Sequence, residues 1–308
     1  MNFADRLVES IRHMGTPLCV GLDPVLGRLP EEIVTQAVGR KGPNREGAAA
    51  ALEAFCRRVL GALCGRVPAV KIQSACFELY GPPGAAAFEA VIKDARALGY
   101  VVIGDLKRGD VGISAQHYAD AWLGGAALPG GKTDPGPGID AITVSAYAGP
   151  DTVEPFLAAC RRQAGGVFVL VATSNPGAGT FQNIGPEGDQ LYNVVARAVH
   201  EWGLGLRGES GYASVGAVVG ATKPQVAAEL RRQMPHAFFL VPGIGAQGAV
   251  AADLAPFFNA DGLGAIVPVS RSLIYAHEAR PGVPFEDAVR DEAENLRKQF
   301  AAVIGAPR

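Results

Sequence analysis

The chain has 308 residues, of which 48% are hydrophobic and 19% charged, a composition typical of a folded globular protein rather than a disordered one. Its formal net charge of −2 gives no electrostatic basis for binding nucleic acid or an anionic membrane, so we expect neither as a partner. Its five cysteines form no CxxC pair, and its first residues lack the continuous apolar core of a secretory signal. It also lacks a run of about 18 apolar residues, so we expect a cytoplasmic protein with reduced thiols.

Short apolar runs recur along the chain, each followed by a turn signal and a longer stretch with helical spacing. The predicted strands span 17–23, 67–73, 100–107, 141–146, 167–174, 214–221, 238–243 and 263–270. The predicted helices span 46–64, 84–98, 114–123, 150–163, 186–203, 224–233, 247–257 and about 284–303. This alternation favours an α/β fold, a (β/α)₈ TIM barrel, over a doubly wound open sheet.

One barrel accounts for residues 1–308 as a single domain. The segment 125–139 is rich in Gly and Pro and is predicted to be an insertion on the N-terminal face, immediately before a strand. No domain boundary is needed there.

Polar residues gather where the predicted strands end, while the upstream parts of the same strands are almost wholly apolar. They are Asp23, Lys71, Gln73, Asp105, Lys107, Ser145, Ser174 and Arg271. Active sites of such barrels lie at the C-terminal ends of the strands and in the loops that follow. The sequence therefore predicts a charged site at one rim.

The segment 100–114, YVVIGDLKRGDVGIS, carries the densest charge at such a strand end. Residues two apart in a strand point to the same side, so Asp105 and Lys107 should project together, with Asp110 in the following loop. Lys71, on the neighbouring strand about 4.8 Å away, can approach them. The alternatives are a surface salt bridge or a structural ion-pair network at the barrel mouth.

Two later loops have the features of an anion site. PGIGAQG (242–248) and VSRS (269–272) follow the seventh and eighth strands, where barrels commonly bind phosphate through backbone N–H groups. Arg271 can add a bidentate charged contact and Gln247 a neutral donor. The alternative is that the glycines serve only tight turns.

A long segment after the fifth strand, TSNPGAGTFQNIGPEG (173–188), contains Ser174 and Asn175. It could hydrogen-bond a flat heterocycle and close over it, or be an ordinary mobile loop.

Together these motifs resemble the orotidine 5′-phosphate decarboxylase family, and most closely its longer bacterial group. GLDP, VKIQSACFE, DLKRGDVGIS, TSNPGA, VPGIGAQG and VSRS occur in the family's order over nearly the whole barrel. The resemblance implies a carboxy-lyase of UMP biosynthesis that acts on orotidine 5′-monophosphate without a metal or other cofactor.

The resemblance also implies roles for individual residues. Lys71, Asp105, Lys107 and Asp110 would form the catalytic charged array, with Asp110 and Ser114 donated across a homodimer. Lys107 would stabilise a carbanion at C6 and protonate it, and Asp105 would lie near the departing carboxylate. Substrate binding would fall to Asp23 and Lys71 at the ribose, Ser174 at the pyrimidine, and Gln247 and Arg271 at the 5′-phosphate.

Two other functions remain to be weighed against this one. Relatives with the same barrel and a similar D-x-K-x-x-D, such as 3-keto-gulonate 6-phosphate decarboxylase and hexulose-phosphate synthase, use Mg²⁺ to stabilise an enediolate. Here Lys71 already places a second cation beside the acids, which favours the metal-free enzyme. A non-catalytic phosphate or nucleotide sensor would keep Arg271 and Gln247 but has no use for Lys107 between two aspartates.

Overall fold

Within residues 1–245 and 248–305, which the computed structural model describes, eight parallel strands close into a barrel. The barrel strands are β1 (Leu18–Leu22), β2 (Ala69–Gln73), β3 (Val101–Arg108), β6 (Ala141–Val144), β7 (Gly166–Ala172), β8 (Ala213–Val219), β9 (Ala237–Leu240) and β10 (Ala265–Val269). Each strand pairs with the barrel strands before and after it in the chain, and β1 closes the ring on β10. The predicted (β/α)₈ TIM barrel is confirmed.

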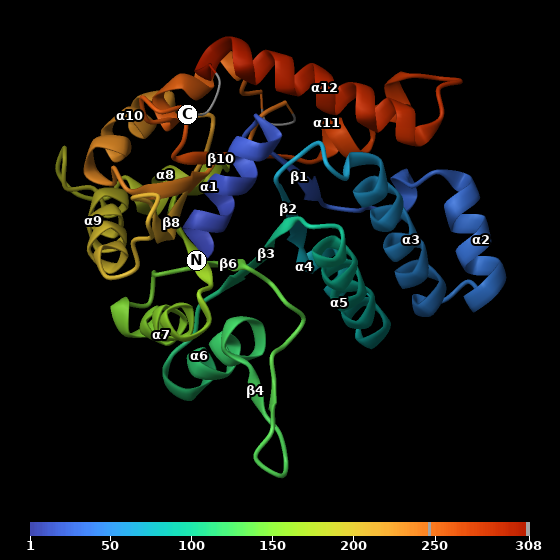
Figure 1. The fold of residues 1–308 in the computed structure, drawn as a ribbon, viewed down its shortest axis with the longest axis horizontal. Helices are drawn as coiled ribbons and strands as arrows, with labels where there is room; N and C mark the ends of the chain where they lie inside the picture. Colours follow the sequence, from blue (N-terminus) through green and yellow to red (C-terminus); the bar gives the residue numbers. More distant parts are fainter. Residues whose placement is uncertain (246–247, 306–308) are drawn as a thin grey trace.

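Helices surround the barrel (Figure 1). The α-helices are α1 (Phe3–Met14), α2 (Glu31–Lys41), α3 (Arg45–Leu63), α4 (Ser74–Glu78), α5 (Pro82–Ala97), α6 (Gly112–Ala119), α7 (Glu154–Gln163), α8 (Gly179–Gln182), α9 (Leu191–Leu204), α10 (Pro224–Gln233), α11 (Arg271–Ile274) and α12 (Phe285–Ile304). No helix among the described residues is both long and apolar enough to cross a bilayer.

Four predicted helices differ from those observed. The helix predicted at 114–123 is α-helical only to Ala119 and ends in a π-helical turn, η2 (Asp120–Gly124). The helix predicted at 150–163 begins with a 3₁₀ turn, η3 (Pro150–Thr152), before α7. The helix predicted at 186–203 starts only at Leu191, because Gly188 has a φ of 79°, outside the helical region. The helix predicted at 247–257 is a 3₁₀ helix, η5 (Ala251–Phe257), and residue 247 lies outside the described residues. Pro256 lies inside η5, where its missing N–H disfavours a continuous α-helix.

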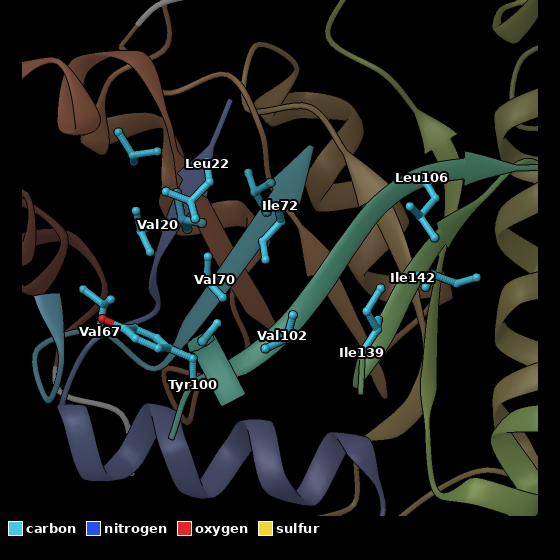
Figure 2. Close-up of a cluster of buried hydrophobic side chains, with 14 of the residues drawn as sticks. Val20, Leu22, Val67, Val70, Ile72, Tyr100, Val102, Leu106, Ile139 and Ile142 are labelled. Carbon is cyan, nitrogen blue, oxygen red and sulfur yellow. The ribbon is translucent and has the colours of Figure 1, made fainter. Parts of the chain in front are cut away.

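Side chains alternate between the inside and the outside of the barrel. On β2, Val70 and Ile72 point outward into the apolar layer beneath the surrounding helices (Figure 2). The residues between them on the same strand, including Lys71, therefore face the barrel interior. The alternation explains how a strand with an apolar outer side can carry a charged group on its inner side.

Helix α1 closes the N-terminal end of the barrel. In Figure 1 it lies across the centre of the ring of strands. Its buried residues Phe3, Leu7 and Ile11 form one apolar cluster with inward-facing strand residues, and the Phe3 ring meets that of Phe168 at 5.8 Å between centroids. Because this end is filled with apolar side chains, only the C-terminal end of the interior is left for polar groups.

The segment 125–139 contains a small antiparallel hairpin, β4 (Ala126–Ala127) and β5 (Thr133–Asp134), which extends away from the barrel (Figure 1). Gly130 and Gly131 lie at its turn with φ values of 79° and 75°, which glycine adopts without a steric cost. The chain then enters β6 at the N-terminal end of that strand. That this segment is an insertion stays a prediction.

A buried arginine, Arg231, is hydrogen-bonded to the start of β9 and to the residue just before β10. Arg231 on α10 is 8% exposed and lies over the ring of Phe239 at 3.7 Å. Its guanidinium donates hydrogen bonds to the carbonyl oxygens of Met234, Ala237, Phe257 and Gly264. Burial lowers the pKa of Arg231 to about 10, so it remains charged at neutral pH.

We expect Arg231→Met to lower the free energy of unfolding by about 2–4 kcal/mol, because it leaves several buried carbonyl groups without a donor. Urea denaturation followed by circular dichroism measures the change. Arg232→Met is the matched control, since Arg232 is the next residue of the same helix and is exposed. Equal stability of the two variants would contradict this role for Arg231.

Candidate active site

A cavity of about 630 Å³ opens at the C-terminal end of the barrel. Leu170, Val218 and Leu240, which lie on β7, β8 and β9, contribute an apolar wall. On the side of β2 and β3 the lining is charged, with Lys71, Asp105 and Lys107. The cavity thus combines a surface suited to a flat apolar group with a concentrated set of charges.

The inward-facing residues of β3 place Asp105 on the C-terminal side of the apolar interior. Val101 and Ile103 belong to the inner apolar cluster, and Asp105 is the next inward position toward the C-terminal end. On β2, Lys71 is level with Ile103, so its long side chain extends toward the C-terminal end to reach Asp105. The predicted placement of both charges at the C-terminal rim is what the structure shows.

Asp105 is held between two lysines. Its Oδ2 lies 2.7 Å from Lys71 Nζ, and its Oδ1 lies 2.6 Å from Lys107 Nζ. Lys71 Nζ also lies 3.2 Å from Asp23 Oδ1, which extends the alternation of charges. A surface salt bridge does not describe this geometry, because Lys71 is 5% exposed and Asp105 is 6% exposed.

Burial and charge pull in opposite directions on these two groups. Burial alone would raise the pKa of Asp105, but the charges of Lys71 and Lys107 outweigh it and hold the pKa of this carboxyl well below its usual range. Burial likewise works to lower the pKa of Lys71, and the charges of Asp105 and Asp23 raise it above its usual value. Asp105 and Lys71 therefore both remain charged at neutral pH.

Two neutral side chains complete the coordination of Asp105. Gln73 Nε2 donates to Oδ2 at 3.1 Å, and the Thr143 hydroxyl donates to Oδ1 at 3.0 Å. Sequence reasoning noted Gln73 only as a polar strand end and missed Thr143 altogether. The signal for Thr143 was its inward position on β6, the strand adjacent to β3.

Lys107 has an unusual backbone for a strand residue. Its φ is 48°, in the left-handed region that side chains with a Cβ avoid at a cost on the order of 1–2 kcal/mol. The pairing of β3 with β6 shifts register between Gly104 and Arg108, so Lys107 leaves the regular ladder. The Lys107 side chain is half-exposed and lines the cavity, where a ligand can reach it.

The residues predicted to bind substrate lie on the other sides of this cavity. Asp23 follows β1, Ser174 follows β7, and Arg271 opens α11 after β10, and all three line the cavity. Gln247 lies outside the described residues. The nearby Gly243 and Gly245 have φ values of 122° and 75°, so the backbone of this loop depends on glycine.

Asp110 and Ser114 are placed differently. Of the described residues, those that line the cavity do not include either of them. The Asp110 carboxylate accepts a hydrogen bond from the N–H of Val111, and Val111 and Ile113 expose 57% and 72% of their surface. A single copy of the chain therefore does not bring these two predicted residues to its own cavity.

The described residues contain no group of three or more His, Cys, Asp or Glu side chains arranged to hold a metal ion. The positive charges at the cavity are those of Lys71, Lys107 and Arg271.

The low pKa of Asp105 predicts how the free energy of unfolding changes with pH. Since its folded-state pKa lies below the unfolded-state value of about 4, its contribution is present above that pH and is lost as the pH falls. As the pH falls below 4, the free energy of unfolding should fall more steeply in the wild type than in Asp105→Asn, and the difference between the two slopes should approach about 1.4 kcal/mol per pH unit. Urea denaturation between pH 5 and pH 3 measures the slopes. Asp151→Asn, which removes an exposed carboxylate, should keep the wild-type slope; equal slopes in all three proteins would contradict the prediction.

Several known proteins are similar to this chain in sequence and architecture over nearly their whole lengths. An orotidine 5′-phosphate decarboxylase from Rhodopirellula baltica is 43% identical over 307 residues, which cover 97% of this chain and 99% of the relative. One from Deinococcus radiodurans is 40% identical, with 98% of each chain covered. The solved OMP decarboxylase of Leishmania donovani is 32% identical with a TM-score of 0.74, and covers 99% of this chain and 100% of its own.

The solved protein from Streptomyces avermitilis, a putative orotidine 5′-phosphate decarboxylase, is 32% identical with a TM-score of 0.78, and covers 99% of this chain and 96% of its own. The sequence model described as "Orotidine 5'-phosphate decarboxylase / HUMPS family" matches residues 16–281, which include every strand of the barrel. The chain belongs to the orotidine 5′-phosphate decarboxylase / HUMPS family.

Proposed function

We propose that the protein is an orotidine 5′-phosphate decarboxylase, which converts orotidine 5′-monophosphate to UMP and CO₂. The observation that carries the proposal is the buried Asp105 held between Lys71 and Lys107 at the wall of the cavity. Relatives with that name match the chain at 43% and 40% identity. The charged array occupies the part of the barrel that hosts catalysis in this fold.

The chemistry of the reaction explains why a fixed cation is needed. When the C6–carboxylate bond breaks, its electron pair stays at C6 in the plane of the ring, where the π system cannot delocalise it. The Lys107 ammonium stabilises this charge as it develops and then transfers a proton to C6, which gives UMP. Because Asp105 holds the ammonium in place beforehand, little reorganisation is required at the moment of reaction. The proposal needs no metal or other cofactor.

The remaining groups bind the parts of the substrate that do not react. Asp23 and Lys71 are paired to each other at the cavity wall and would contact the ribose hydroxyls, and Ser174 would contact the pyrimidine. Arg271, together with Gln247 and the glycine-rich loop, would bind the 5′-phosphate. Binding energy from the phosphate is then available to close the site around the reacting ring.

A homodimer would complete the site. Asp110 lies outside its own cavity, beside the exposed apolar residues Val111 and Ile113, so contact with a second copy would bury this surface. In that dimer Asp110 and Ser114 would reach the partner's cavity, and Asp110 would complete the Lys-Asp-Lys-Asp array. All five cysteines are free thiols, which suits the reducing cytoplasm where we propose the enzyme acts.

We expect Lys107→Ala to abolish decarboxylation, because it removes both the cation beside C6 and the proton donor. The assay follows the loss of orotidine 5′-monophosphate absorbance in the presence of EDTA, which separates this reaction from the Mg²⁺-dependent ones. Lys93→Ala is the control, since Lys93 is exposed on α5. Near-normal turnover by Lys107→Ala, or wild-type activity that requires added Mg²⁺, would refute the proposal.

The shared site predicts complementation between two inactive variants. In a heterodimer of Lys107→Ala and Asp110→Ala subunits, one of the two sites contains the natural residue at both positions. Random exchange of an equal mixture should therefore restore about a quarter of the wild-type sites. The two variants are mixed, and the same assay is run before and after mild denaturation has allowed their subunits to exchange. The difference between the two rates measures the recovery. If exchanged heterodimers form and no activity returns, Asp110 does not act across the interface.

A further inference from the structure

The Thr143 hydroxyl links the two groups on which the proposed chemistry depends. Thr143 lies on β6 and is 1% exposed. Its Oγ1 accepts a hydrogen bond from the backbone N–H of Lys107 at 2.9 Å and lies 3.0 Å from Asp105 Oδ1. A backbone N–H can only donate and an ionised carboxylate can only accept, so the single hydroxyl proton must point to Asp105.

The hydrogen bond from the Lys107 N–H to the Thr143 hydroxyl lies where the regular pairing of β3 with β6 is interrupted. The register of β3 against β6 shifts between Gly104 and Arg108, and Lys107 adopts a φ of 48° within that interval. Leaving the partly buried N–H of Lys107 without an acceptor costs free energy, and the Thr143 hydroxyl supplies that acceptor. The side chain of Thr143 thereby stabilises a backbone conformation that a non-glycine residue rarely adopts.

The same hydroxyl limits how the Asp105 carboxylate can rotate. Oδ1 receives Lys107 Nζ and Thr143, and Oδ2 receives Lys71 and Gln73. Four donors on two oxygens define the plane of the carboxylate. Loss of Thr143 would remove the one donor that is also bonded to the backbone of Lys107.

We propose that Thr143 is a positioning residue, which sets both the orientation of Asp105 and the backbone from which Lys107 extends. This inference rests on the proposed decarboxylase activity, in which the Lys107 ammonium must be held at C6. Thr143 itself does not have to touch the reacting atoms. Its contribution should therefore appear in the rate of the chemical step rather than in substrate affinity.

The test compares two substitutions that differ in the hydroxyl. Thr143→Val has nearly the same shape but can neither accept from Lys107 nor donate to Asp105, and we expect its kcat to fall about 10- to 100-fold. The KM for orotidine 5′-monophosphate and the Kd for UMP should change less than about threefold, since the phosphate and ribose contacts remain. Thr143→Ser keeps the hydroxyl and should retain kcat within about threefold.

A matched control separates positioning from general loss of stability. Thr16 is 1% exposed, accepts a hydrogen bond from the N–H of Leu18, and lies just before β1 at the opposite end of the barrel. Thr16→Val removes a similar bond and should leave kcat at the wild-type value. Thermal unfolding of each variant identifies any that fails to fold.

The possible results are distinct. Absence of decarboxylation by the wild type would refute the proposed function, whereas unchanged kcat in Thr143→Val beside an active wild type would overturn only the role of Thr143. A kcat in Thr143→Ser as low as in Thr143→Val would also overturn it. A crystal structure of Thr143→Val provides a readout independent of activity: we expect a rotated Asp105 carboxylate or a changed φ at Lys107, and unaltered geometry at both would contradict the inference.

Discussion

The burial of one carboxylate, Asp105, between two ammonium groups is the constraint on which the rest of the site depends. An isolated buried charge costs several kcal/mol, so Asp105 can be ionised there only because four side-chain donors contact its two oxygens. Those donors come from three adjacent strands, with Lys71 and Gln73 on β2, Lys107 on β3 and Thr143 on β6. The cluster thus requires the three strands to keep their observed alignment, including the register shift between β3 and β6.

The barrel separates the part of its interior that stabilises the fold from the part that carries charge. Toward the N-terminal end, α1 and the inward residues of the strands form an apolar cluster. Above this base, toward the C-terminal end, inward positions of β2 and β3 face the cavity with Lys71 and Asp105. The apolar cluster at the N-terminal end is packed without these charged groups. The free-energy cost of removing the charges from water is offset by the contacts that they make with one another.

Strain is concentrated at the residue to which we assign the chemistry. Lys107 combines a left-handed backbone, a register shift beside it and an ammonium directed at the cavity. Such a conformation persists only where the surroundings hold it, here through Thr143 and Asp105. Asp110, three residues later, does not line its own cavity, so this short segment would serve one site through Lys107 and, in the proposed dimer, a second site through Asp110.

The sequence by itself determined the barrel and the rim that carries the charges. Eight apolar runs separated by helical stretches can be recognised in the sequence alone. The sequence also shows that the charged residues Lys71, Asp105 and Lys107 come at the ends of such runs. Only the tertiary structure decided that the backbone of Lys107 is left-handed and that the Thr143 hydroxyl is hydrogen-bonded to both Lys107 and Asp105. Both features depend on the register between β3 and β6. Alternation along β6 places Thr143 on the inward side, but it does not identify the groups that the hydroxyl contacts. Its partners lie 36 and 38 residues earlier in the chain, and pairing of the strands alone brings them together.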